Sequence, residues 1–311
     1  MHFPIRKGLF KRTVGHVYAV DGVNLDIHTG RTLALVGESG CGKTTAGKAL
    51  LQLLCPTDGS IRYRNQELSG LTAKGMRSLR AQLQIIFQDP FSSMNPRMMV
   101  SSILEEGMRA QGIAATGWER QQRIEALLEH VGLPKEAAQR YPHEFSGGQR
   151  QRICIARALA VEPRLIVCDE PTSALDVSVQ AQTLNLLKQL QDEMGLSYLF
   201  ITHNLSVVAY LAHDVAVMYL GRIVEQGPVS RILEDPRHPY TEALLSAVPT
   251  IEPDGREVIR LEGELPSPIN PPSGCHFHPR CPKAMDVCKE SYPEVTPLEG
   301  EREVRCFLYE K

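Results

Sequence analysis

Residues 33–44 read LALVGESGCGKT, a short apolar run that leads directly into a glycine-rich loop. The apolar residues 33–36 are predicted to form a buried strand, and residues 46–54 after the loop are predicted to form a helix. Residues 37–44 fit the pattern G-x-x-x-x-G-K-[ST], which cradles phosphate groups where it connects a strand to a helix. The sequence therefore predicts an α/β fold built around a phosphate-binding loop.

The residue types in this loop suit the binding of a nucleotide. Glycines let the backbone turn tightly and point its N–H groups at an anion, and the N-terminus of the following helix adds partial positive charge. Lys43 is expected to reach the β- and γ-phosphates, and the Thr44 hydroxyl to ligate Mg²⁺. Cys41 is interpreted as a small filler residue rather than a redox group. The candidate nucleotide-binding residues are Gly37, Ser39, Gly40, Cys41, Gly42, Lys43, Thr44 and Thr45.

Two further apolar runs end in polar residues. Residues 165–168 precede Asp169 and Glu170, and residues 199–202 precede His203. Ligands bind at the C-terminal ends of strands in open α/β sheets. We therefore expect Asp169 to hold Mg²⁺ through water, and Glu170 to act as general base or to orient the attacking water. His203 is expected to contact the γ-phosphate. The acidic pair taken alone could be a solvated strand end, but the phosphate loop favours the catalytic role.

The segment between these two strands is predicted to be helical. Residues 177–194 carry apolar side chains at helical spacing, and Gly195 follows them as a helix-ending residue. Strand, helix and strand in this order make a parallel βαβ unit.

The composition excludes several other classes of protein. Lys and Arg total 34 against 36 Asp and Glu, and the resulting charge of −2 argues against a nucleic-acid binder. No apolar run approaches the roughly 18–20 residues that cross a bilayer, and the N-terminus does not resemble a secretory signal. We therefore expect a cytosolic chain whose cysteines are thiols or metal ligands. Trp118, the only tryptophan, is interpreted as a packing residue.

Residues 145–149, FSGGQ, open a predicted helix and narrow the family. Their glycines make a second anion site of the same physical kind as the first, and an ordinary helix cap is the alternative. With this motif, the chain resembles the nucleotide-binding subunits of ABC transporters over about residues 1–230. Residues 37–44 match the Walker A motif, and residues 165–169 match the Walker B motif. Residues 145–149 match the signature motif, with Phe where Leu is common, and residues 173–176 match the D-loop. Gln88 matches the glutamine of the Q-loop, Glu170 matches the catalytic glutamate and His203 matches the switch histidine.

The resemblance implies an α/β P-loop NTPase of the ABC cassette type, with a RecA-like core, a mixed sheet and an α-helical subdomain at about residues 89–160. It implies two cassettes that close head to tail around two ATP molecules. Ser146, Gly147, Gly148 and Gln149 of one cassette are then expected to bind the γ-phosphate held by the other. The remaining expected roles are catalysis for Glu170, His203 and Gln88, nucleotide contact for Asp176, and Mg²⁺ binding for Thr44, Gln88 and Asp169.

The N-terminus departs from the family pattern. Cassettes of this family usually begin with a strand before an aromatic residue that stacks on adenine. Phe3 matches that aromatic residue by its place before residues 4–8, PIRKG, and Tyr18 is the alternative. Because no strand precedes Phe3 in the sequence, we expect either a misassigned start or a shortened chain.

The residues after 230 resemble the C-terminal extension of dipeptide and oligopeptide importer cassettes. Thirteen of the 21 prolines lie in residues 228–311, and residues 235–245 and 263–275 carry the likeness. We therefore expect a cassette over residues 1–230 and a Cys/Pro-rich extension over residues 231–311.

This resemblance also implies partners. It points to the second, F-type cassette of an importer, on the cytoplasmic face of the inner membrane. The expected partners are two permeases, a second cassette that is a different chain or a copy of this one, and indirectly an external binding protein. Related cassettes serve glutathione, nickel chelates and D-amino-acid dipeptides. A soluble ABC ATPase is disfavoured because no tandem cassette or coiled-coil insertion is present.

The extension carries four cysteines with the spacing C-x₅-C-x₆-C-x₁₇-C. The absence of a C-x₂-C pair makes this a poor zinc-ribbon pattern. Four thiolates in a proline-rich loop can hold an iron–sulfur cluster, and the resemblance favours a 4Fe–4S cluster because some relatives carry one here. Zinc and unligated thiols are the alternatives, with His276 and His278 as bystanders. The candidate ligands are Cys275, Cys281, Cys288 and Cys306.

Overall fold

The computed structural model describes residues 1–8, 11–248 and 258–310. The chain divides into two compact units. Unit 1 comprises Met1–Ile27, Thr32–Ile61 and Ile201–Lys311, and unit 2 comprises His28–Arg31 and Arg62–Phe200.

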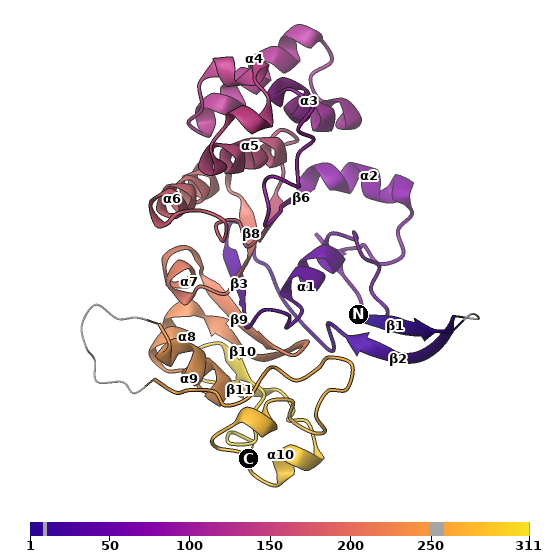
Figure 1. The fold of residues 1–311 in the computed structure, drawn as a ribbon, viewed down its shortest axis with the longest axis vertical. Helices are drawn as coiled ribbons and strands as arrows, with labels where there is room; N and C mark the ends of the chain where they lie inside the picture. The colour runs from indigo at the N-terminus through magenta and orange to yellow at the C-terminus, as the bar shows by residue number, and fades with distance from the viewer. Residues whose placement is uncertain (9–10, 249–257, 311) are drawn as a thin grey trace. The chain divides into compact units, whose positions relative to one another are not determined.

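Unit 1 contains a mixed sheet with the strand order β11-β12-β10-β9-β3 (Figure 1). Strands β3 and β9 run parallel, with Leu33 opposite Asp214 and Val36 opposite Val217. The pairs β9–β10, β10–β12 and β11–β12 are antiparallel. The bounds of these strands are β3 (Thr32–Val36), β9 (Asp214–Tyr219), β10 (Arg222–Pro228), β11 (Thr296–Leu298) and β12 (Arg302–Val304).

The other elements of unit 1 are short helices and an N-terminal hairpin. Strands β1 (His2–Lys7) and β2 (Arg12–Tyr18) pair antiparallel with each other. The helices are α1 (Lys43–Leu50), α7 (Leu205–Leu211), α8 (Val229–Glu234), α9 (Pro239–Ser246), the 3₁₀ turn η3 (His278–Arg280) and α10 (Val287–Glu290).

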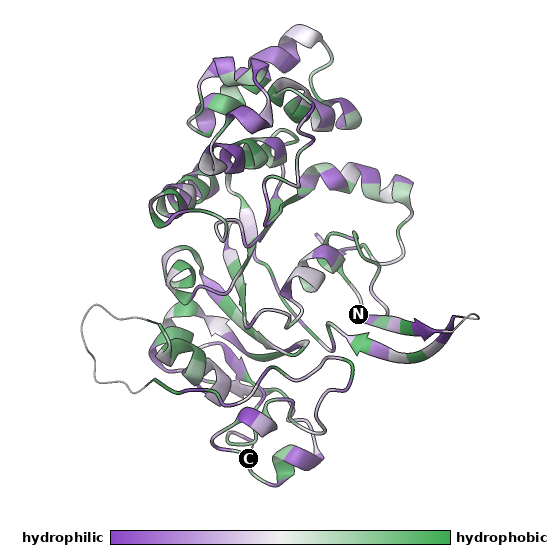
Figure 2. Ribbon diagram, viewed as in Figure 1, coloured by the Kyte–Doolittle hydropathy of each residue, from purple (hydrophilic) through white to green (hydrophobic). Residues whose placement is uncertain are grey.

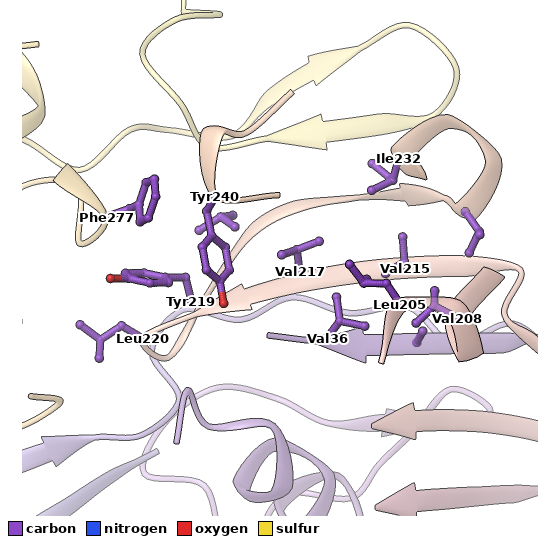
Figure 3. Packing of buried hydrophobic residues seen from close by; sticks show 13 residues of the cluster. Val36, Leu205, Val208, Val215, Val217, Tyr219, Leu220, Ile232, Tyr240 and Phe277 are labelled. Carbon is purple, nitrogen blue, oxygen red and sulfur yellow. The ribbon is translucent and has the colours of Figure 1, made fainter. Parts of the chain in front are cut away.

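The core of unit 1 combines residues from the sheet and from the C-terminal extension. Figure 3 shows Phe277 beside Tyr219 and Tyr240. The ring of Phe277 lies 5.2 Å from that of Tyr219 and 5.4 Å from that of Tyr240, measured between centroids. Burying one such side chain contributes about 1.5–3 kcal/mol. The extension is therefore packed into the same hydrophobic cluster as strands β3 and β9.

Unit 2 carries the strand order β8-β7-β6 and most of the long helices (Figure 1). Strands β6 and β7 run parallel, with Leu83 opposite Leu165 and Ile86 opposite Cys168. The strands are β4 (Arg62–Tyr63), β5 (Gln66–Glu67), β6 (Leu83–Ile86), β7 (Leu165–Asp169) and β8 (Ser197–Thr202). The helices are α2 (Ala73–Gln82), α3 (Val100–Gln111), α4 (Gly117–His130), η1 (Lys135–Gln139), η2 (Pro142–Glu144), α5 (Gly147–Leu159) and α6 (Val177–Met194).

Helix α4 shows how the sequence specifies these elements. Thr116 and Glu119 form a capping box, with the Glu119 amide donating to Thr116 Oγ1 at 3.2 Å and the Thr116 amide donating to the Glu119 carboxylate at 3.0 Å. Ile124, Leu127 and Leu128 are buried at i, i+3 and i+4 spacing. Hydrophilic and hydrophobic residues accordingly alternate along the helix in Figure 2.

The structure confirms most predicted elements and corrects two details. Strands appear at β3, β7 and β8, and residues 177–194 form helix α6, which ends at Gly195 with φ 64°. The first helix begins and ends earlier than predicted, because Gln52 has φ 53° and breaks the helix after Leu50. The interpretation of Trp118 as a packing residue is wrong, because this residue is 72% exposed.

Helix α4 offers a matched test of its buried face. Leu128→Ala removes a fully buried side chain, and we expect a loss of about 2–5 kcal/mol of unfolding free energy because a cavity remains. Trp118→Ala on the same helix, where the side chain is exposed, is expected to cost less than about 1 kcal/mol. Urea unfolding of both variants checks this. Equal losses for the two variants would contradict the packing described.

Candidate functional site

The phosphate loop is shaped by two close backbone approaches. A Cβ on Gly37 would lie 2.1 Å from the carbonyl oxygen of Met218, and one on Gly42 would lie 2.0 Å from that of Ala19. Gly42 also has φ 110°, a conformation that residues with a side chain rarely adopt. These two glycines are therefore required by the packing of the loop.

Lys43 begins helix α1 at the end of this loop and is buried. Its ammonium donates to the carbonyl oxygens of Gly37 at 2.7 Å and Glu38 at 2.9 Å. Within the described part of the chain, no side chain caps the helix N-terminus at Gly42. Thr44 and Thr45 follow in the first helical turn, where N–H groups favour an anion. The loop thus holds a cation and a helix N-terminus together.

The remaining loop residues take two different environments. Ser39 and Gly40 are exposed at the tip of the loop. Cys41 is buried, and burial raises the pKa of its thiol. The thiol is therefore protonated at neutral pH, as suits a filler residue.

His203 lies close to the phosphate loop within unit 1. It follows strand β8, and together with Asn204 it lines a pocket of about 350 Å³ that Gly37 and Glu38 also line. The Asn204 side chain accepts a 3.0 Å hydrogen bond from the Ser206 amide and so fixes the chain direction after His203. The structure thus brings His203 and the phosphate loop together.

Unit 2 brings together Gln88 and Glu170. Both residues follow the C-terminal ends of parallel strands, β6 and β7, so they reach the same edge of the sheet. Gln88 Nε2 donates to Glu170 Oε2 at 3.2 Å. Asp169 ends β7 and is buried, whereas Glu170 has φ 46°, a strained value for a residue with a side chain. Strained backbone of this kind is common at functional sites.

The signature segment forms a capped helix start. The Gln149 amide donates to Ser146 Oγ at 3.4 Å, and the Ser146 amide donates to Gln149 Oε1 at 3.0 Å. A Cβ on Gly148 would lie 2.3 Å from Cγ1 of Val179 on helix α6, so close helix packing requires this glycine. Gly147 precedes it in the first turn, and Asp176 is the residue before α6. The structure therefore contains the ordinary helix cap that was the alternative interpretation of residues 145–149.

The two candidate adenine-stacking residues sit in the β1–β2 hairpin. Phe3 lies within β1 rather than after a strand, and it is 37% exposed. Tyr18 ends β2, and its ring is edge-on to that of His2 with centroids 4.6 Å apart. Phe3 therefore presents the more accessible ring.

The four cysteines of the extension have common surroundings. All are free thiols, and Cys306 interacts electrostatically with the other three. Burial raises the pKa of Cys275 and Cys306 to about 11. Among residues 1–8, 11–248 and 258–310, no three His, Cys, Asp or Glu side chains lie in an arrangement that holds a metal ion. The Met285 amide donates to Cys288 Sγ at 3.5 Å, and the His278 amide donates to the carbonyl oxygen of Cys275 at 3.0 Å.

Sequence reasoning missed three residues that hold the phosphate loop. Glu38 occupies a free position of the motif, yet its amide donates to the Tyr240 hydroxyl at 2.9 Å and its carboxylate accepts from Arg280 at 3.0 and 3.1 Å. These partners lie 202 and 242 residues away in the sequence, so no local pattern marks them.

Comparisons with known proteins agree with this geometry. The sequence model of the ABC transporter family matches residues 20–173, and that of the oligopeptide/dipeptide transporter C-terminal region matches residues 224–288. The oligopeptide transport ATP-binding protein AppF of Bacillus subtilis is 52% identical over 99% of this chain and 94% of its own length. The dipeptide transport ATP-binding protein DppF of Escherichia coli is 48% identical over 100% of this chain and 92% of its own length.

Solved structures show the same fold. CbiO1 of Clostridium perfringens, part of an ABC transporter complex, is 27% identical with a TM-score of 0.63, covering 75% of this chain and 90% of its own. The dimeric cassette MJ0796, bound to ADP and Pi in a post-hydrolysis state, is 28% identical with a TM-score of 0.64, covering 73% of this chain and 98% of its own.

These findings define the molecule as an ABC-type ATP-binding cassette, in agreement with the resemblance seen in the motifs. The chain belongs to the family of oligopeptide and dipeptide transport ATP-binding proteins. Across the described residues, no helix is both long and apolar enough to cross a membrane.

The loop glycines allow a direct test of the cradle. Gly37→Ala places a methyl group against the Met218 carbonyl, and we expect ATP affinity to fall at least about tenfold as the loop is displaced. Gly117→Ala is the control, because nothing lies within 4 Å of its added Cβ and the residue lies outside the loop. Titration with a fluorescent ATP analogue measures both. A Gly117 variant as weak as the Gly37 variant would rule out the steric explanation.

Proposed function

We propose that this chain hydrolyses ATP to power the import of dipeptides or oligopeptides through membrane permeases. The observation that carries the proposal is the Gln88–Glu170 hydrogen bond of 3.2 Å, which orients a carboxylate at the end of a parallel strand. The peptide class rests on the relatives, which are named as oligopeptide and dipeptide transport proteins. Glutathione, nickel chelates and D-amino-acid dipeptides are alternative substrates.

Binding of ATP is assigned to the phosphate loop. Loop amides and Lys43 contact the phosphates, and the exposed ring of Phe3 stacks on adenine. The buried Lys43 ammonium already lies among loop carbonyl oxygens, so exchanging these for phosphate oxygens requires little movement. The binding set on this side is Phe3, Gly37, Ser39, Gly40, Cys41, Gly42, Lys43, Thr44 and Thr45.

A Mg²⁺ ion suits the oxygen donors that the sequence offers. Thr44, Gln88 and Asp169 supply a hydroxyl, an amide carbonyl and a carboxylate, which are the ligands that Mg²⁺ prefers. Gln88 uses its Nε2 on Glu170, and its Oε1 is the atom suited to the ion. The ion neutralises phosphate charge when it is bound.

Hydrolysis is assigned to Glu170. Its carboxylate accepts a proton from the attacking water, while the Gln88 amide holds that carboxylate in place. His203 contacts the γ-phosphate from the pocket it shares with Gly37 and Glu38. A general base contributes about 10²–10⁴-fold to the rate, so its removal is a measurable loss.

A second cassette completes the site in this proposal. Ser146, Gly147, Gly148 and Gln149 lie at the N-terminus of helix α5, where the partial positive charge of a helix favours an anion. We assign the γ-phosphate of the opposite cassette to it, with Asp176 beside that nucleotide. The dimeric cassettes among the solved structures support this arrangement. Loss of the γ-phosphate removes one of the anchors and reopens the dimer.

The proposed assembly places the chain at the cytoplasmic face of the cell membrane. Its partners are two permeases and a second cassette, a different chain or a copy of this one, with an external binding protein acting indirectly. We divide the chain into a cassette at residues 1–230, with a helical subdomain at about 89–160, and an extension at 231–311. The match of the extension's family model to residues 224–288 supports that boundary.

Substitution of the general base separates ATP binding from hydrolysis. We expect Glu170→Gln to lower ATP turnover at least about 100-fold while an ATP-bound dimer accumulates, because only the proton acceptor is lost. Glu129→Gln, at an exposed ion pair with Lys135, is the charge-matched control and keeps wild-type turnover. Phosphate release and size-exclusion chromatography measure the two effects. Wild-type turnover in Glu170→Gln would overturn the general-base role.

We further propose that Cys275, Cys281, Cys288 and Cys306 hold a 4Fe–4S cluster. Four cysteines match the number of thiolates that such a cluster takes. Burial and the neighbouring thiols of Cys275, Cys281 and Cys288 raise the pKa of Cys306, so the four thiols lie near one another. A single zinc ion fits less well, because the cysteine spacing contains no C-x₂-C pair.

The cluster is tested on protein purified without oxygen. We expect visible charge-transfer absorbance and bound iron in the wild type, and loss of both in Cys306→Ser. Cys55→Ser, at an exposed cysteine outside the extension, serves as the control and is expected to keep both signals. Wild-type protein that is purified without oxygen and shows neither bound iron nor visible absorbance would contradict the proposed cluster.

A further inference from the structure

Glu38 of the phosphate loop is held from three directions, all within unit 1. Its amide donates to the Tyr240 hydroxyl at 2.9 Å, and its carbonyl oxygen accepts from the Lys43 ammonium at 2.9 Å. Its carboxylate accepts two hydrogen bonds from Nη1 of Arg280, at 3.0 and 3.1 Å. Two of these three partners belong to the C-terminal extension, so the extension directly holds the loop that contains Lys43.

Arg280 is itself rigidly placed. It ends the 3₁₀ turn η3, whose preceding residue Phe277 is buried in the aromatic cluster with Tyr219 and Tyr240. The Cys275 carbonyl accepts from the His278 amide at 3.0 Å, which tightens the turn further. The backbone that carries Arg280 is therefore held in place by packing and hydrogen bonds, and its side chain reaches the loop from this fixed position.

The ion pair between Arg280 and Glu38 is largely shielded from water. The side chain of Arg280 is 8% exposed and that of Glu38 is 26% exposed. In the described structure Arg280 Nε is buried without a hydrogen-bond partner, so the guanidinium relies on Glu38 and on Tyr219, whose hydroxyl lies 3.5 Å from Nη1. A shielded pair is costly to break, because the remaining charge stays poorly solvated.

Charge gives this pair a role in phosphate binding. Glu38 lines the same pocket as Gly37 and His203, so this acidic residue lies beside the proposed site of the ATP phosphates. Without a counter-charge, that carboxylate would repel the phosphates, and the repulsion is strong where water is scarce. Arg280 cancels the charge of Glu38 and at the same time fixes its backbone.

We propose that Arg280 is a positioning residue for ATP, through which the C-terminal extension neutralises Glu38 and holds the phosphate loop in its binding geometry. The proposal rests on the proposed binding of ATP at this loop. In this proposal the extension contributes directly to the affinity for ATP. This contribution does not depend on whether the four cysteines hold an iron–sulfur cluster.

The test compares three variants of the full chain by ATP titration. Arg280→Gln leaves the Glu38 carboxylate without its counter-charge, and we expect the Kd for ATP to rise about tenfold, equivalent to about 1.4 kcal/mol. The double variant Arg280→Gln/Glu38→Gln removes the repelling charge as well, and its Kd is expected to return to within about threefold of wild type. The tenfold loss is expected to shrink in high salt, which screens the repulsion.

Lys283→Gln is the matched control for general damage to the extension. Lys283 lies in the same extension and pairs with Glu242 at 2.7 Å, at half-exposed positions. We expect its Kd for ATP to equal that of wild type. Thermal unfolding of every variant separates folding from binding, because a merely structural role predicts that the double variant is at least as weak as Arg280→Gln.

Two outcomes would overturn the inference, namely an unchanged Kd in folded Arg280→Gln, or no recovery in the double variant. Failure of the proposed function looks different. In that case the wild type itself would not bind ATP, or Lys43→Ala would bind as tightly as wild type.

Discussion

The phosphate loop depends on one steric constraint, the approach of two backbone carbonyls to its glycines. The oxygens of Met218 and Ala19 occupy the space that a Cβ on Gly37 or Gly42 would need. Close contact with the end of β9 is thereby built into the loop, and the Gly221 amide reinforces it by donating to the Cys41 carbonyl at 2.9 Å. Because the backbone is fixed in this way, the Lys43 ammonium and the start of α1 have one defined position.

Features that depend on neighbouring residues could be predicted from the sequence. The strand–loop–helix order around residues 37–44 and the βαβ unit ending at His203 follow from apolar patterns and glycine chemistry. Gln88 is identified only through the family resemblance, and its hydrogen bond to Glu170 follows from the parallel pairing of β6 and β7 that the structure shows. The pairing of Glu38 with Arg280 could not be predicted, because tertiary folding alone brings together residues 242 positions apart.

The C-terminal extension is part of the structure that positions the loop. It has few apolar residues for a core of its own, and the structure shows that it shares the core of unit 1 through Phe277. Strand β12 also pairs with β10, with Glu225 opposite Val304. The segment is rich in proline and cysteine, yet it is not a separate domain. It is a part of unit 1 with a different local architecture.

In this mechanism, ATP hydrolysis on this chain drives peptide import. A transporter reconstituted in proteoliposomes from this chain, its permeases, a second cassette and the binding protein tests this coupling. Labelled dipeptide is supplied on the side of the binding protein, and ATP on the side of this chain. We expect peptide transport that accompanies ATP hydrolysis, with both lost when Mg²⁺ is chelated. Peptide transport that continues without ATP hydrolysis would contradict it.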